Sequence, residues 1–151
     1  MSTSDRQSGQ ATWLVRAGLL LFLLALVAGL LVAQFPVPRL GLSVHLLGIV
    51  QGLFLAVLGL LWPRLRLTRA WCRVAFWLVI YGCLAAWASN VLAAVWGGSS
   101  MLPMASGQAR GSALQDEMIT VGLRSAAISL ISATVLILLG IRSGEPVEPG
   151  R

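Results

Sequence analysis

Four long apolar runs constrain what this chain can fold into more than any other feature. They cover residues 13–33, 41–61, 70–96 and 113–141. A helix needs about 20 apolar residues to cross the hydrocarbon core of a bilayer, and each run is long enough. Hydrophobic residues make up 58% of the 151 residues and charged residues only 11%, about half the charged share of a soluble domain. We therefore expect an all-α integral membrane four-helix bundle, a multi-pass protein of the cell membrane, which in a bacterium is the inner membrane.

Turn-forming segments separate the four runs. Pro36 and Pro38 stop the first helix, because proline lacks the backbone N–H that a helix interior needs. A short arginine-containing loop at 64–69 joins the second and third runs, and the longest connection, 97–112, is rich in glycine and serine. Loops of that length are often binding loops or lids. The chain thus divides into a disordered N-terminal tail at 1–12, a transmembrane domain at 13–141 and a disordered C-terminal tail at 142–151.

Arginine supplies all of the positive charge and indicates the topology. The eleven basic residues give a net charge of +6, but they form no basic run, so nucleic-acid binding is not indicated. Most of them fall on one side of the four spans, and cytoplasmic loops carry the excess of arginine. We therefore expect both termini in the cytoplasm. The arginines on that side are Arg6, Arg16, Arg64, Arg66, Arg69, Arg73, Arg142 and Arg151, with Arg39 and Arg110 on the other.

The single histidine of the chain lies within the second span, on a stripe of very small residues. At about 100° per residue, the stripe occupies an arc of roughly 80° on one face of the helix. A titratable group inside a membrane is costly and often functional, and the missing side chains would let a flat ligand or a neighbouring helix approach closely. The residues of the stripe are Gly41, His45, Gly48, Gly52, Ala56 and Gly59.

His45 has two interpretations: a polar contact between helices, or a ligand. A zinc site built from one subunit is implausible, because the chain has no second histidine and the second span has no carboxylate. Haem iron needs only one protein ligand, and neutral imidazole is a natural one. The small residues Gly41, Gly48 and Gly52 would then face the haem, or would pack against a helix.

A few polar side chains in the spans could also carry chemistry. Gln51 lies about 120° around the helix from His45, and Tyr81 and Asn90 lie in the third span. Each could hydrogen-bond a substrate oxygen or hold two helices together. Arg124, inside the fourth span, could bind a haem propionate or an acid of a neighbouring subunit, or extend its charge to the interface. No Ser/His/Asp set, carboxylate dyad or glycine-rich phosphate loop is present.

Several of these residues lie in segments that resemble hydroxylaminobenzene mutase, and the likeness runs from about Gly18 to Ile141. The matching segments are Pro38–Gly48 with Arg39, Gly41, Ser43 and His45, then Gln51-Gly52, Leu58–Trp62, Tyr81-Gly82, Trp87, Leu92–Gly97 and Met101–Met104. The resemblance implies a small membrane isomerase that turns an arylhydroxylamine into a 2-aminophenol, a reaction of nitroaromatic degradation.

A more distant likeness to styrene oxide isomerase covers the second and third spans. It implies a homotrimer with haem b at the subunit interfaces, and His45 as the ligand of the iron. Gln51 matches a substrate-contacting asparagine of that family. The family's catalytic tyrosine falls near Ser89 or Asn90, and neither of these is tyrosine.

The two resemblances together predict a mechanism. Ferric haem b on His45 would act as a Lewis acid on the N–OH oxygen, while Gln51 and Asn90 orient the substrate. Tyr81 is the third candidate catalytic residue. The alternatives are an epoxide or other N–O isomerase that uses the same site, or a non-catalytic bundle. The latter would be either a haem-binding membrane subunit or a channel-like oligomer in which the glycine stripe only packs helices.

Overall fold

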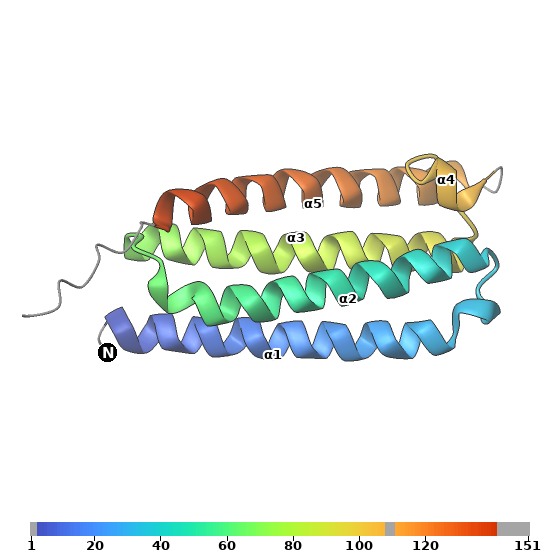
Figure 1. Ribbon diagram of the computed structural model, residues 1–151. Coiled ribbons are helices and arrows are strands. Elements are labelled where there is room, and N and C mark those ends of the chain that lie inside the picture. Colours follow the sequence, from blue (N-terminus) through green and yellow to red (C-terminus); the bar gives the residue numbers. More distant parts are fainter. Residues whose placement is uncertain (1–2, 108–110, 142–151) are drawn as a thin grey trace, which may run out of the picture.

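Four long helices make up most of the described chain, residues 3–107 and 111–141 of the computed structural model (Figure 1). The short turns between them are η1 (Val32–Gln34), η2 (Trp62–Arg64) and α4 (Pro103–Ser106). Each long helix contains a stretch long and apolar enough to cross a membrane, so the expected all-α, four-span architecture is confirmed. The long helices are α1 (Thr3–Leu30), α2 (Pro38–Leu61), α3 (Arg69–Trp96) and α5 (Ala113–Gly140).

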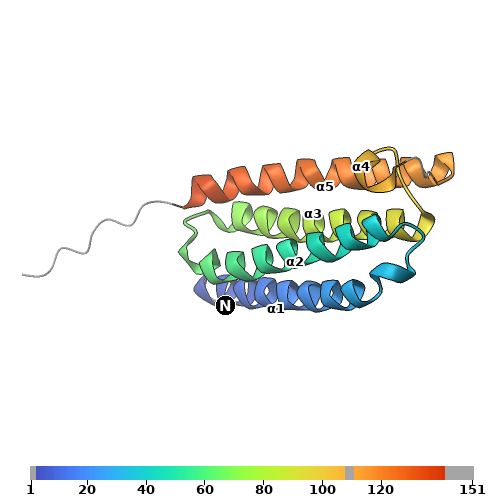
Figure 2. The same cartoon turned by 45° about the vertical axis from the view of Figure 1, so that its right-hand side comes forward.

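The helices form a row in the order α1, α2, α3, α5, as both ribbon views show (Figures 1 and 2). α1 packs closely on α2 and α3 on α5, whereas the α2–α3 contact is smaller. α1 barely approaches α3, and the backbone of α5 approaches no long helix besides α3 within the described residues. The bundle is therefore two antiparallel helix pairs joined through α2 and α3.

The first helix begins at Thr3, whereas the sequence led us to expect a disordered tail up to residue 12. Hydrogen bonds between the first turns of α1 and the turn that joins α2 to α3 explain why this segment is helical. The Gln7 amide nitrogen donates to the carbonyl oxygens of Trp62 and Leu65, at 2.8 and 3.1 Å. The Gln10 Oε1 atom accepts from the indole N–H of Trp62 at 3.2 Å. The other expected tail, 142–151, lies outside the described residues.

The other helix ends follow local sequence signals. Pro38 occupies the first turn of α2, where its missing N–H costs nothing. The Thr68 side chain caps α3, and Ser112 with Gln115 forms a capping box at the start of α5. α3 ends at Gly97, whose φ of +87° is a left-handed conformation that glycine adopts without strain.

The connection between α3 and α5 is held against the start of α5 by one carboxylate. Asp116 accepts from the Ser99 hydroxyl at 2.7 Å and from the Ser100 backbone N–H at 2.8 Å. The Ser106 hydroxyl accepts from the Ser99 backbone N–H at 3.0 Å, and α4 lies against α2. The part of the connection from Ser99 to Ser106 is thus tied to the start of α5.

The backbones of α1 and α2 approach each other closely where the two helices cross. A methyl group built on Gly52 would lie 2.8 Å from the Gly18 carbonyl oxygen and 2.8 Å from the Phe22 backbone nitrogen. One built on Gly18 would meet the backbone of α2 equally closely. No side chain fits at either position without separating the helices, so Gly18 and Gly52 fix the distance between α1 and α2.

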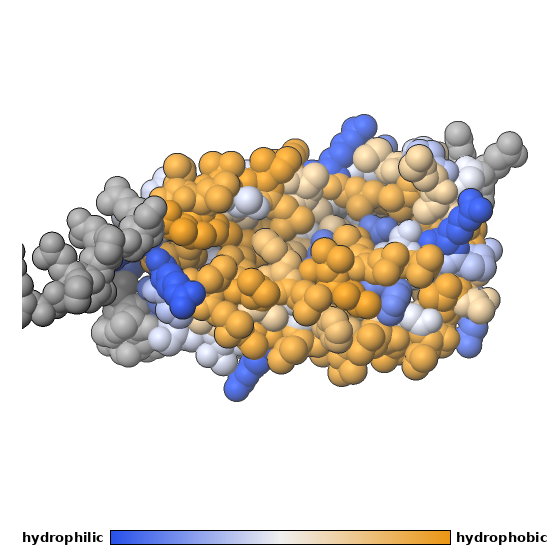
Figure 3. Space-filling model, in the orientation of Figure 1, coloured by the Kyte–Doolittle hydropathy of each residue, from blue (hydrophilic) through white to orange (hydrophobic). Residues whose placement is uncertain are grey.

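The molecular surface fits a protein that spans a bilayer. Apolar residues cover the middle of the face seen in Figure 3, and hydrophilic residues gather toward its two ends. The start of α1, the end of α5 and the η2 turn lie at the same end of the molecule (Figure 1). The segment at this end that joins α2 to α3 carries Arg64, Arg66 and Arg69.

Replacing Gly52 with alanine should destabilise the protein, because the added methyl would overlap two backbone atoms of α1. Overpacking of this kind costs about 1–3 kcal/mol of unfolding free energy, measurable by denaturation in mixed micelles. The matched control is Gly9→Ala, since a methyl at Gly9 would have no neighbour within 4 Å. Equal stabilities of the two variants would contradict the close crossing.

The arginine distribution predicts that the end with the start of α1 and the end of α5 faces the cytoplasm. A green fluorescent protein fused to the C-terminus should therefore fluoresce, and an alkaline phosphatase fused at the same point should be inactive in a bacterial host. An active phosphatase fusion would reverse the predicted orientation.

Candidate functional site

His45 lies at the contact between α1 and α2, with its ring against the backbone of α1. Its Nδ1 atom is 2.8 Å from the carbonyl oxygen of Ala25. A methyl group built on Gly29 would lie 2.5 Å from the same nitrogen, so the ring occupies the space that a side chain at Gly29 would fill. The ring is half-buried. Its position therefore depends on two residues of α1 that have little or no side chain.

The hydrogen bond to Ala25 determines which tautomer the neutral ring adopts. A carbonyl oxygen can only accept, so Nδ1 must carry the proton. Nε2 then keeps its lone pair, which is the arrangement found in metal-ligating histidines that donate their other N–H to a backbone carbonyl. His45 is therefore prepared to act as an Nε2 ligand or as a hydrogen-bond acceptor.

The glycine stripe on α2 is covered by other parts of the chain. A methyl on Gly48 would meet Ala25 and Trp87, and one on Gly59 would meet Val15 and the Ala11 carbonyl oxygen. Gly52 lies against α1, as described above, and Gly41 lies against Phe35. Of the two interpretations of this stripe, the structure therefore supports helix packing. Gly41, Gly48 and Gly52 each lie against another part of the same chain.

Gln51 is the most unusual polar residue of the spans. Only 7% of it is exposed, and its Oε1 atom is buried without a hydrogen-bond partner. Leaving a buried acceptor unsatisfied costs about 1–3 kcal/mol, so a native protein seldom does so without a reason. Gln51 does not hold helices together through this oxygen. The arrangement suits a residue whose partner is a bound molecule.

Asn90 and Trp87 lie one turn apart on α3. The Asn90 amide nitrogen donates to the Ala86 carbonyl oxygen of its own helix at 3.0 Å, and the residue is buried. The Trp87 indole N–H donates to the Val44 carbonyl oxygen at 3.2 Å. Trp87 thus joins α3 to α2 at the residue that precedes His45, and it holds the two helix pairs together near the histidine.

Tyr81 and Arg124 lie on the other helix pair. The Tyr81 hydroxyl is 2.8 Å from the Ser125 hydroxyl of α5, yet 51% of Tyr81 is exposed. Arg124 is also exposed, within the span formed by α5. No hydrogen bond described in the structure joins any two of His45, Gln51, Tyr81 and Asn90. Tyr81 therefore contacts α5, whereas His45 contacts α1.

Sequence reasoning missed the α1 half of the histidine site. The first run consists mostly of leucine, valine and alanine. Ala25 and Gly29 were therefore not predicted as site residues. A signal was present, because Gly18, Ala25 and Gly29 share one face of a helix. Small residues on a shared face mark close helix contacts in membranes.

The described residues contain no cluster of three or more histidine, cysteine or acidic side chains. A cofactor that brings most of its own ligands to the metal, as haem does, needs only His45.

Comparison with known proteins identifies the family. The family model described as styrene oxide isomerase matches residues 10–142. Hydroxylaminobenzene mutase HabA of Ectopseudomonas oleovorans is 44% identical over 131 residues, which cover 86% of this chain and 97% of that protein. Hydroxylaminobenzene mutase HabB of the same organism is 39% identical over 144 residues, 95% of this chain and 88% of that protein. No solved structure matches. The chain therefore belongs to the styrene oxide isomerase family.

Proposed function

We propose that this protein is a membrane isomerase that converts an arylhydroxylamine, such as hydroxylaminobenzene, into a 2-aminophenol. In this reaction the N–O bond breaks, a C–O bond forms at the ortho carbon, and the ortho proton passes to nitrogen. The product has the same atoms as the substrate, so no external oxidant or reductant is needed. Two relatives that cover most of the chain and are named hydroxylaminobenzene mutase support this assignment.

The proposal includes a haem b held by His45. The observation that carries it is the hydrogen bond from Nδ1 to the Ala25 carbonyl oxygen, which leaves Nε2 as the ligating atom. When bound, ferric haem supplies a Lewis acid that draws electron density from the hydroxylamine oxygen.

The side chains of the chain would bind and orient the substrate. The unpartnered Oε1 of Gln51 would accept an N–H or O–H of the hydroxylamine group, and Asn90 would provide a second polar contact. Fixing the substrate in this way raises the rate by proximity and orientation. The apolar spans would limit attack by bulk water on the ring, which would otherwise lead to the para product.

A homotrimer with haem at the subunit interfaces remains part of the proposal. His45 lies on the α1–α2 pair, whereas Arg124 and Tyr81 are exposed on the α3–α5 pair. An arginine on the outer face of a span is costly unless it finds a partner. A second copy packed against the α3–α5 pair would bring Arg124 to a haem propionate and Tyr81 toward the substrate.

Epoxide isomerisation is the second candidate, because the matching family model is described as styrene oxide isomerase. The same Lewis acid would act on an epoxide oxygen. Assays of the purified protein with hydroxylaminobenzene and with styrene oxide separate the two functions, and we expect the higher kcat/KM with hydroxylaminobenzene.

Replacing His45 with alanine should remove both the haem and the activity. We expect the wild-type protein to show a Soret band in detergent. In the variant the band should be lost and kcat/KM should fall by at least about 100-fold, because a Lewis acid contributes several kcal/mol. Added imidazole should partly restore both. A colourless, fully active wild-type protein would contradict the haem, and a coloured protein that turns over neither substrate would favour a non-catalytic subunit.

Replacing Gln51 with leucine should lower kcat/KM by about 10–100-fold through the lost substrate hydrogen bond. The unfolding free energy should stay the same or rise, because the buried Oε1 has no partner to lose. The matched control is Ser129→Ala, which removes a buried hydrogen bond to the Leu78 carbonyl oxygen. It should lower stability and leave kcat/KM unchanged. Gln51→Leu behaving like the control would assign Gln51 a purely structural role.

A further inference from the structure

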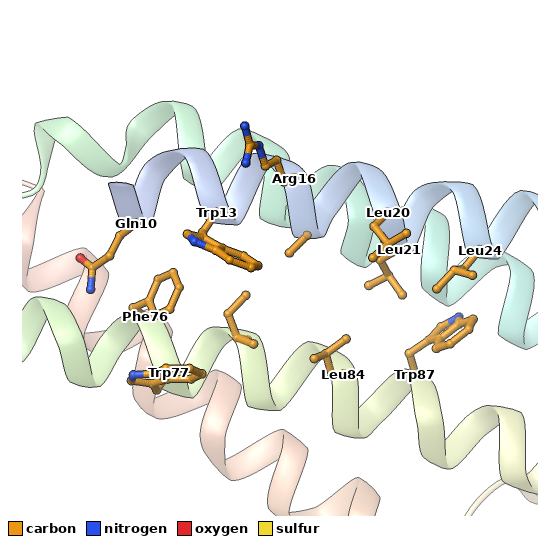
Figure 4. A pocket seen from close by; sticks show the side chains of 12 residues that line it. Gln10, Trp13, Arg16, Leu20, Leu21, Leu24, Phe76, Trp77, Leu84 and Trp87 are labelled. Carbon is orange, nitrogen blue, oxygen red and sulfur yellow. The ribbon is translucent and has the colours of Figure 1, made fainter. Parts of the chain in front are cut away.

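Trp87 contacts α2 at the turn that carries His45. Its indole projects from α3 at the end of an apolar groove of about 570 Å³ between α1 and α3, with Leu24 opposite it (Figure 4). The indole N–H donates to the Val44 carbonyl oxygen at 3.2 Å. That carbonyl belongs to the same planar peptide unit as the backbone nitrogen of His45. The hydrogen bond from α3 therefore holds the backbone of the histidine itself.

Gly48 gives the indole room to reach this carbonyl. A methyl group built on Gly48 would lie 2.6 Å from the indole nitrogen of Trp87 and 2.6 Å from the Ala25 methyl. Both α1 and α3 thus contact α2 at one residue, three positions after His45. A carbonyl oxygen inside a helix accepts one backbone N–H and keeps a second lone pair for another donor. The Trp87 bond therefore adds to the helix and does not replace one of its own bonds.

His45 is held by two helices that scarcely touch each other. α1 fixes the ring, because Nδ1 lies 2.8 Å from the Ala25 carbonyl oxygen. α3 fixes the peptide unit before it, through Trp87, and α1 and α3 make few contacts of their own. An indole N–H without an acceptor is costly in apolar surroundings, so the Trp87 bond opposes a shift of this turn of α2. Such a shift would move the ring relative to Ala25.

We propose that Trp87 is a positioning residue for His45. By fixing the peptide unit that ends at the His45 nitrogen, it keeps the ring where Nδ1 donates to the Ala25 carbonyl oxygen. The lone pair of Nε2 then stays available. Without the indole N–H the bond to Ala25 weakens, and the ring proton can occupy Nε2 instead. The proposal deepens the proposed function, on which only its consequence for turnover rests.

The test uses the full-length protein labelled with ¹⁵N-histidine in lipid nanodiscs. His45 is the single histidine of the chain, so a ¹⁵N spectrum reports on its two ring nitrogens alone. At alkaline pH, a wild-type protein without haem should show a protonated Nδ1 and a bare Nε2. Trp87→Phe keeps an aromatic ring and removes the donor, and it should add a second pair of signals from the tautomer with the proton on Nε2.

A protein that carries haem is tested by resonance Raman spectroscopy of its reduced form. The iron–imidazole stretching band falls in frequency when the ring N–H loses its acceptor. We expect Trp87→Phe to lower this band by a few wavenumbers. Its kcat should fall by about tenfold at a similar KM, since small misplacements of reacting groups are costly. A wild-type protein without a Soret band would contradict the haem of the proposed function, and the ¹⁵N spectrum would still test Trp87.

The matched control is Trp62→Phe, which also removes an indole hydrogen bond of 3.2 Å, in this case to the Gln10 Oε1 atom. It should lower the unfolding temperature and leave the His45 signals like those of the wild type. Signals of His45 that are unchanged in Trp87→Phe, or changed equally in both variants, would overturn the proposal. If Trp87→Phe does not fold, benzothienylalanine in place of Trp87 exchanges only the N–H for sulfur, and the same outcomes decide.

Discussion

The close crossing of α1 and α2 is the constraint on which the rest of the structure depends. Gly18 and Gly52 bring the two backbones so near that no side chain fits between them. That distance places the His45 ring over Gly29 and its Nδ1 within 2.8 Å of the Ala25 carbonyl oxygen. The Ala25 carbonyl oxygen can accept from Nδ1 only because the two helices lie this close. The spacing of α1 and α2 thus determines that Nε2 of His45 keeps its lone pair. The chemistry available at His45 is thus set by glycines that touch nothing but the neighbouring helix.

Because α1 packs on α2, α3 contacts α2 and α5 and scarcely touches α1. The four helices therefore lie in a row. Trp87 bridges to α2 through the Val44 carbonyl oxygen, and α5 follows α3 through contacts such as the hydrogen bond from Ser129 to the Leu78 carbonyl oxygen. α1 and α3 are held apart, so a groove remains between them. In water such an exposed apolar groove would favour aggregation, whereas a bilayer offers apolar surroundings for it.

The sequence predicts the four spans well because length and hydropathy alone decide whether a segment can cross a bilayer. It predicts the start of α1 poorly, because the polar turns near Gln7 are held by Trp62 and Leu65, more than fifty residues away in the chain. The glycine stripe of α2 shows a second limit of prediction from the sequence. Periodicity gives the residues that share a face of α2, but which surface covers that face depends on where α1 lies. For the same reason the sequence indicated His45 and not its partners on α1.

His45 and Gln51 differ in how firmly the fold constrains them, and this bears on how such a site can change its substrate. Altering His45 disturbs a ring that is fitted between two backbones and hydrogen-bonded to one of them. Altering Gln51 removes no hydrogen bond made by its Oε1, because that atom has no partner in the chain. Replacing Gln51 should therefore change the free energy of unfolding little, because its Oε1 makes no stabilising hydrogen bond. We therefore expect differences in substrate range among related proteins to arise at the position of Gln51, while the small residues under His45 stay small.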